Sequence, residues 1–205
     1  MNRHNDVEYA LISSNSQYID TGIISSGNLT IEISFKKTLD ITGYDSIIYG
    51  GRSASGTSVR MLYIARNNQS LNTKYQSGTA LPLGSTALEK GVFHNIVDSP
   101  QSVQVNGITH INRNPINFTA NSTICLFTTK TNNVVDLGQM FSGQIKSCVI
   151  KNDLGETLRD FIAVPQGSTR HSSIPAPSNC MFDRVSNAYF ENNGTGTFGV
   201  VEISD

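Results

Sequence analysis

The most regular pattern of hydrophobic and polar positions lies between Asn28 and Lys37. Two sets of side chains alternate there: Leu29, Ile31, Ile33 and Phe35 are apolar, and Thr30, Glu32, Ser34 and Lys36 are polar. Successive side chains of a strand point to opposite faces of its sheet. The period of two therefore predicts a strand with one buried and one exposed face.

The stretch from Gly143 to Pro165 predicts a β-hairpin. Residues 145–150 form a run rich in β-branched side chains, and residues 157–164 resume an extended run that ends at Pro165. Between the two runs lie Asn, Asp and Gly, which tolerate positive φ or bond to their own backbone. A turn of three to five residues that contains glycine is typical of a hairpin.

Short extended runs separated by turn residues continue along the whole chain, and Asn106-Gly107 is a strong two-residue turn signal. Further strands are expected at 7–13, 45–49, 59–65, 70–75, 92–97, 102–105, 108–111, 123–128, 180–183, 188–191 and 198–203. No segment of ten or more residues carries helical periodicity, so an all-β sandwich or barrel is predicted. No linker or shift in composition divides the chain, which indicates one domain over residues 1–205, with the first and last strands close together.

Composition and charge exclude several classes of partner. A chain of 205 residues is ordinary for one all-β domain. The formal net charge of -1 gives no electrostatic reason to expect nucleic acid or an anionic membrane. No apolar run approaches the length of a membrane span, which argues against membrane insertion. The N-terminal residues are polar where a signal peptide would be apolar, so synthesis and folding in the cytoplasm are expected.

The three cysteines, Cys125, Cys148 and Cys180, are widely spaced. The first two lie inside apolar runs, and we expect buried, free thiols. Closely spaced Cys or His ligands are absent from the sequence, so no metal site and no cofactor are predicted. A single Ca²⁺ held by loop Asp or Asn side chains stays open.

Four stretches, taken in order, resemble one family over nearly the whole chain. They are Glu8-Tyr9 with 14–22, then 93–97, then 141–160, and finally 182–198. They resemble the concanavalin A-like lectin/glucanase superfamily, in the LamG-like form common in phage and prophage structural proteins. The first, third and fourth stretches are specific. In the second, Phe93 stands where the family has Trp.

The resemblance implies a jelly-roll sandwich of two antiparallel sheets. It also implies phage or prophage virion proteins as relatives, often with carbohydrate-binding roles. The favoured hypothesis is therefore a non-enzymatic phage virion protein, made in the host cytoplasm, whose domain is exposed on a tail or capsid. There it would contact host surface glycan and other virion proteins. The alternative is a purely structural module for protein–protein contacts, because this fold hosts lectins, hydrolases and scaffolds. The oligomeric state stays open, a homo-oligomer included, and nothing resembles a coiled-coil stalk.

A glycoside hydrolase is the disfavoured third hypothesis. On this fold it needs two carboxylates across a cleft, usually supplied by Glu-x-Asp-x-Glu on one strand. No such triplet occurs, and Glu32 is flanked on its face by Thr30 and Ser34. The stretch Gly50-Gly51-Arg52 lacks the Lys and the helix of a phosphate loop. No catalytic residue is therefore predicted.

Sugar binding normally uses an aromatic ring together with planar polar groups. The chain has no Trp, so Tyr is the available platform. The candidate ligand-binding residues are Tyr63 and Lys74, on faces opposite the apolar stripes, and Arg52 on the adjoining loop. An ordinary sheet aromatic is the alternative interpretation of Tyr63. His94 is expected to pack within its strand, and Arg60 and Arg66 are expected at solvated strand ends.

Overall fold

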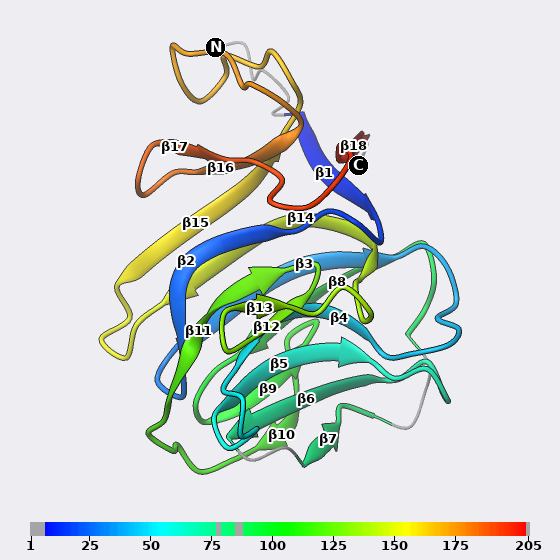
Figure 1. Ribbon diagram of the computed structural model, residues 1–205, viewed down its shortest axis with the longest axis vertical. Coiled ribbons are helices and arrows are strands. Elements are labelled where there is room, and N and C mark those ends of the chain that lie inside the picture. Colours follow the sequence, from blue (N-terminus) through cyan, green and yellow to red (C-terminus); the bar gives the residue numbers. More distant parts are fainter. Residues whose placement is uncertain (1–6, 77–78, 85–87, 204–205) are drawn as a thin grey trace.

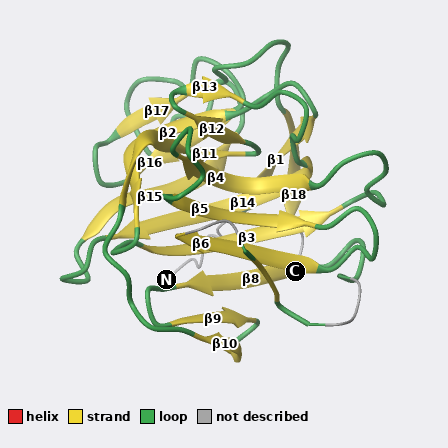
Figure 2. Cartoon of the chain, turned by 60° about the horizontal axis from the view of Figure 1, so that its bottom comes forward, coloured by secondary structure: helices red, strands yellow, loops and turns green. Residues whose placement is uncertain are grey.

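Two β-sheets pack face to face in the computed structural model of the chain, which describes residues 7–76, 79–84 and 88–203 (Figure 1). Strands and loops make up this described part, with no helix (Figure 2). Consequently no described segment is a helix long and apolar enough to cross a membrane. The predicted all-β class is confirmed.

The described strands follow the turn signals of the sequence closely. Their bounds are β1 Glu8–Ser14, β2 Ile19–Ser26, β3 Thr30–Lys37, β4 Ser46–Arg52, β5 Val59–Ile64, β6 Leu71–Gln76, β7 Ala80–Pro82, β8 Phe93–Asp98, β9 Ser102–Val105, β10 Ile108–Asn112, β11 Thr119–Leu126, β12 Thr129–Thr131, β13 Val134–Val135, β14 Ser142–Lys151, β15 Thr157–Val164, β16 Cys180–Asp183, β17 Ala188–Phe190 and β18 Gly199–Ile203. Between β9 and β10, Asn106 and Gly107 both have positive φ, 51° and 81°, as the predicted two-residue turn requires.

The larger sheet has ten strands, with the path β10-β9-β8-β3-β14-β15-β16-β17; in addition, β1 pairs with β14, and β18 pairs with β1. The smaller sheet has eight, with the path β13-β12-β4-β5-β6-β7; in addition, β11 pairs with β4, and β2 pairs with β11. Among the described strand pairs all are antiparallel except β12 with β4. β1 pairs with β18, so the expected proximity of the first and last strands is confirmed.

The hairpin predicted between Gly143 and Pro165 is β14 and β15, with Ser147 opposite Ile162. Its turn is closed by a hydrogen bond from the Asn152 N–H to the Glu156 carbonyl at 3.0 Å. The β14 strand lies centrally, because β3 pairs along its other edge. The hairpin is therefore a structural centre of the larger sheet.

The core lies between the two sheets. Ile31, Ile33 and Phe35 of β3 face it, as their alternation predicts, and Leu62 and Ile64 of β5 face it from the opposite sheet. The three cysteines are free and buried, also as predicted. Burial raises the pKa of Cys125 and of Cys180 to about 12. These thiols are therefore unreactive at neutral pH.

Arg60 does not lie at a solvated strand end, and that prediction is wrong. Its side chain is fully buried, because Arg60 shares the inner face of β5 with Leu62 and Ile64. The Asp98 carboxylate of β8, in the opposite sheet, forms an ion pair with it at 3.2 Å. Arg66, in contrast, is exposed as expected.

The turn between β16 and β17 depends on Asp183, which is fully buried. Burial alone would raise the pKa of this carboxyl. Hydrogen bonds from the Ser186 hydroxyl and from the backbone N–H groups of Asp160, Val185 and Ser186 outweigh that cost and lower the pKa below its ordinary value. The folded state therefore stabilises the carboxylate form.

A specific pH dependence follows for Asp183. Because its pKa is lower in the folded than in the unfolded chain, its contribution is complete above the unfolded pKa of about 3.9 and is lost as the pH falls through the folded value. Asp183→Asn should lower the free energy of unfolding at pH 7 by about 1.5–3 kcal/mol. The loss should shrink towards pH 3 in urea titrations. Asp153→Asn, at an exposed turn position, is the control, and equal losses at pH 7 and pH 3 would contradict this account.

Candidate functional site

A polar hollow of about 290 Å³ opens on the outer face of the smaller sheet. We call it the β4–β6 hollow, after the strands that form its floor. Its lining consists of Asp45, Ile47, Arg52, Met61, Tyr63, Lys74, Asp136 and Gln139. All three sequence-predicted binding residues, Arg52, Tyr63 and Lys74, thus lie in one hollow.

Strand register explains why these side chains meet. Met61 of β5 lies opposite Lys74 of β6, and Tyr63 lies opposite Ile47 of β4. Directly opposed residues in a sheet share a face, so all four point away from the core. Arg52 is the last residue of β4 instead of part of the adjoining loop, which corrects its expected place. The outward-facing set was foreseeable from the alternation in β5.

Gly50 of β4 lies opposite Met61, one of the residues that line the hollow. A Cβ atom at this position would lie 2.7 Å from the Thr129 hydroxyl oxygen of β12 and 3.3 Å from the Met61 side chain. Contacts this short are not tolerated without a shift of the neighbours. The glycine therefore lets β12 and β5 approach β4 closely on both sides, as a glycine in a strand interior commonly does.

The charged groups of the hollow are held in defined positions. The Arg52 guanidinium lies 3.5 Å from the Asp136 carboxylate and donates from Nε to the Thr131 hydroxyl at 2.5 Å. Asp136 also accepts the Gly138 N–H at 3.0 Å. Within the described part of the chain, no carboxylate is paired with the Lys74 ammonium, which lies 5.5 Å from the centre of the Tyr63 ring. The hollow thus presents oriented donors and acceptors.

The Tyr63 side chain is almost entirely covered. Only 5% of its surface is exposed, and Lys74 lies over the ring. Burial, together with the nearby Asp45 carboxylate, raises the pKa of Tyr63 to about 12. Its hydroxyl therefore stays protonated at neutral pH and can donate a hydrogen bond. The expectation that Tyr63 could serve as a stacking platform is not met by this geometry.

Sequence reasoning missed Asp45, Asp136 and Gln139. Asp136 and Gln139 follow the short strand β13. Asp136 reaches the hollow through β12, because its N–H donates to the Thr129 carbonyl at 2.9 Å, and Gln139 reaches β4 because its carbonyl accepts the Ile47 N–H at 2.9 Å. Nothing in the local pattern indicates either contact. Asp45 had a weak signal, because it is two residues before the outward-facing Ile47 and has the same parity.

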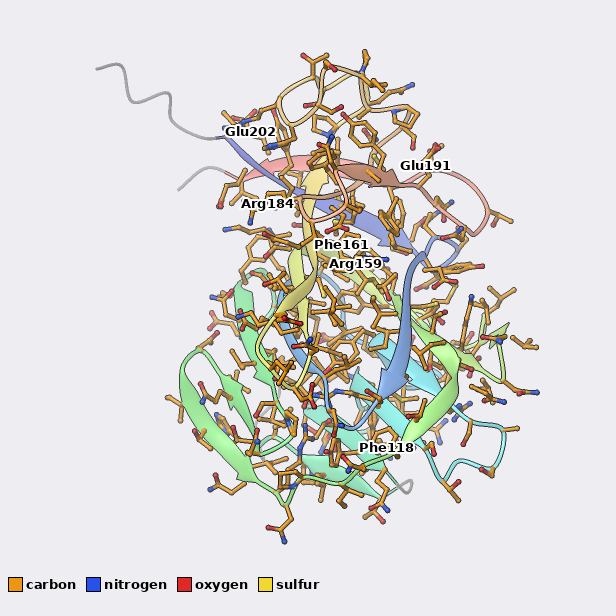
Figure 3. The ribbon with its side chains drawn as sticks, turned by 90° about the vertical axis from the view of Figure 1, so that its left-hand side faces the viewer. Phe118, Arg159, Phe161, Arg184, Glu191 and Glu202 are labelled. Atoms are coloured by element: carbon orange, nitrogen blue, oxygen red, sulfur yellow. The ribbon has the colours of Figure 1, made fainter. Side chains whose placement is uncertain are left out.

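Charged residues elsewhere in the described chain take structural roles. Arg184 binds Asp160 through two hydrogen bonds of 2.9 Å, and Arg159 donates to the Thr21 carbonyl at 3.0 Å. Both arginine side chains are labelled in Figure 3. His94 is buried, and its Nε2 lies 3.2 Å from the Glu89 carbonyl oxygen, which fits the expected packed role. The described residues contain no group of three or more His, Cys, Asp or Glu side chains that could hold a metal ion.

No family model matches the chain, and no curated protein matches its sequence. Among solved structures, it aligns with a candidate carbohydrate-binding protein from Bacteroides ovatus at a TM-score of 0.62 and 16% identity, over 97% of this chain and 61% of that chain. It also aligns with a heptameric SAP-like pentraxin from Limulus polyphemus at 0.51 and 12%, over 74% and 77%. The chain has a concanavalin A-like jelly-roll fold.

A third similar structure is the CBM40 domain of a Ruminococcus gnavus sialidase, bound to α2,3-sialyllactose, at a TM-score of 0.49 and 16% identity, over 68% of this chain and 88% of that chain. At such identities the similarity to known structures establishes the fold alone. In this sandwich the β4–β6 hollow lies on the outer face of the smaller sheet. What the hollow can bind must therefore be inferred from its own residues.

Proposed function

We propose that this chain is a carbohydrate-binding domain that holds glycan hydroxyl groups in the β4–β6 hollow and does not cleave them. The observation that carries the proposal is the convergence of Arg52, Lys74, Tyr63, Asp45 and Asp136 on one hollow. A sugar hydroxyl both donates and accepts hydrogen bonds. A site that alternates cationic donors, a phenol and carboxylate acceptors satisfies both needs.

The structural similarity to the candidate carbohydrate-binding protein from Bacteroides ovatus supports this proposal. A hydrolytic role fits less well. One oxygen of Asp136 pairs with Arg52 and the other accepts a backbone N–H, so both oxygens already have partners within the protein, whereas a general acid or base needs a free oxygen directed at the substrate. The proposal therefore assigns no catalytic residue.

The narrower part of the proposal is the setting: a domain exposed on a phage or prophage particle that contacts host surface glycan. The sequence resemblance supports it. Gene neighbourhood is the test. Capsid or tail genes beside this gene are expected, and polysaccharide-utilisation genes there would contradict the virion setting while leaving sugar binding intact.

Glycan binding itself is tested with a glycan array followed by calorimetry on the bound sugar. Arg52→Ala and Lys74→Ala should each weaken binding about 10- to 100-fold, because each removes a charged hydrogen-bond donor. Lys151→Ala is the matched control, since Lys151 pairs with Glu32 on the larger sheet. Unchanged affinity in both hollow variants would move the site elsewhere.

Failure to bind any sugar at millimolar concentration, where weak sites are still seen, would contradict the proposed function. That result would favour the alternative of a structural module for protein–protein contacts.

A further inference from the structure

A second hollow, of about 160 Å³, opens beside the first. Its lining comes from the loop between β3 and β4, from Asn15 after β1, and from Met140 and Ser142 near the start of β14. Asp45 lines both hollows. The two hollows therefore adjoin at Asp45.

The loop between β3 and β4 is braced by side chains of the turn between β5 and β6. Gln69 accepts the Ile41 N–H at 2.7 Å and donates to the Ile41 carbonyl at 2.8 Å, so it pairs with the loop as a strand would. Arg66 donates to the Gly43 carbonyl at 2.7 Å, and its N–H donates to Asp45 at 3.1 Å. The loop thus has a fixed path without belonging to either sheet.

Tyr44 is carried by this braced loop between Gly43 and Asp45. It is 59% exposed and lines the second hollow together with Leu39, which is 62% exposed. An aromatic ring that faces water from a braced loop offers the surface that stacking on the C–H face of a sugar requires. Tyr63 cannot supply that surface, because its ring is covered.

The volumes of the two hollows also favour a ligand larger than one sugar unit. Ligand pockets commonly enclose about 300–1,000 Å³. The β4–β6 hollow, of about 290 Å³, lies just below this range, and the second hollow, of about 160 Å³, lies well below it. Together they offer room for more than one sugar unit, with hydrogen-bonding groups in one compartment and an aromatic surface in the other.

We propose that the second hollow is an additional saccharide subsite in which Tyr44 stacks on a sugar ring, so that the ligand is an oligosaccharide spanning Asp45 and not a single sugar. This inference rests on the proposed function and names its substrate class. In this arrangement Tyr44 determines how many sugar units the oligosaccharide needs, while Arg52 and Lys74 bind the sugar unit in the β4–β6 hollow.

The test is calorimetry with glucose, N-acetylglucosamine and the tetraoses of the malto, cello, laminari and chito series. The bound tetraose should bind at least about 10-fold more tightly than its monosaccharide. Tyr44→Ala should weaken tetraose binding about 2- to 10-fold and leave the monosaccharide unchanged, and Tyr44→Phe should bind as the parent does, because the ring is kept. Leu154→Ala, at a 79% exposed position on the hairpin turn, is the control.

The outcomes separate the two proposals. A tetraose that binds no better than its monosaccharide, or that is weakened by Arg52→Ala but not by Tyr44→Ala, would overturn the subsite and keep the proposed function. Absence of binding by every one of these probes would overturn the subsite for these sugars, and absence of binding by every sugar of the glycan array as well, at millimolar concentration, would overturn both proposals.

Discussion

Asp98→Ala should lower the free energy of unfolding by about 3–5 kcal/mol, the cost of removing one partner from a buried ion pair. The Asp98 carboxylate is fully buried between the sheets. Arg60 donates to it at 3.2 Å and to its backbone carbonyl at 2.6 Å, and Arg113 and the Tyr49 hydroxyl bind it as well. It thus ties β8 of the larger sheet to β4 and β5 of the smaller one.

The reason for the large effect is the charge that would remain. Arg60 is fully buried and the Arg113 side chain is 7% exposed, so neither guanidinium can recover a full hydration shell. The Tyr75 ring, whose centre lies 3.9 Å from the Arg113 guanidinium, offers only partial compensation. Without Asp98, the Arg60 and Arg113 guanidinium groups would both lose the carboxylate that balances their charge.

Urea denaturation measures the loss, and Glu32→Ala is the matched control. Glu32 forms an ion pair with Lys151, but it is 37% exposed, so its removal should cost about 0–1 kcal/mol. Asp98→Asn, which keeps the shape and one acceptor oxygen, should fall between the two. A cost for Asp98→Ala no larger than that for Glu32→Ala would show that the buried cluster does not hold the sheets together.

The strand pattern was predictable because it is local. Alternation of apolar and polar residues in β3 and the turn residues of the β14–β15 hairpin determine where strands begin and end, whatever pairs with them. Arg60 shows the limit of this reasoning. Its parity with Leu62 and Ile64 indicates an inward side chain, whereas its charge favours exposure to solvent. The Asp98 carboxylate that compensates this charge lies on a strand of the other sheet, where the local pattern of β5 gives no sign of it.

The candidate site was predictable in part for the same reason. Tyr63 and Lys74 share a face through antiparallel register, which follows once β5 and β6 form a hairpin. The place of Asp136 beside Arg52 depends on the pairing of β12 with β4, two segments far apart in the sequence, which no local pattern encodes. Tyr44 was overlooked because a lone Tyr in a loop has no periodicity, and its significance comes only from the hollow beside it.

Phe141→Ala should cost about 3–5 kcal/mol, the upper range for large-to-small substitutions in a core. Phe141 is fully buried and packs edge-on against Phe35 of β3, with ring centres 5.7 Å apart. On its other side lies Phe127, with ring centres 6.2 Å apart, and Phe127 in turn packs on Phe198 at 5.1 Å. The substitution would open a cavity in the middle of an aromatic row that joins both sheets to the last strand.

The neighbouring Gly143 explains why this cavity cannot close locally. A Cβ atom at position 143 would lie 2.3 Å from the Phe141 ring, so the ring rests on the bare backbone of β14. Once the ring is removed, no side chain at Gly143 is available to fill its place. Residual cavity volume, not only the lost apolar surface, sets the cost of such substitutions.

A double-mutant cycle measures the energetic coupling between Phe141 and Gly143. In the parent chain Gly143→Ala should cost about 1–3 kcal/mol through overpacking against Phe141. In the Phe141→Ala background the added methyl group enters the cavity, so Gly143→Ala should lower the free energy of unfolding by less than in the parent chain. Some cost should remain, because the Lys36 carbonyl oxygen lies 2.8 Å from the new Cβ position. Equal costs of Gly143→Ala in the two backgrounds would contradict the ring-on-glycine contact. A reduced cost would show that the glycine near the start of β14 is required by the phenylalanine two residues before it, which gives a packing reason for the Phe-x-Gly spacing at the start of the hairpin.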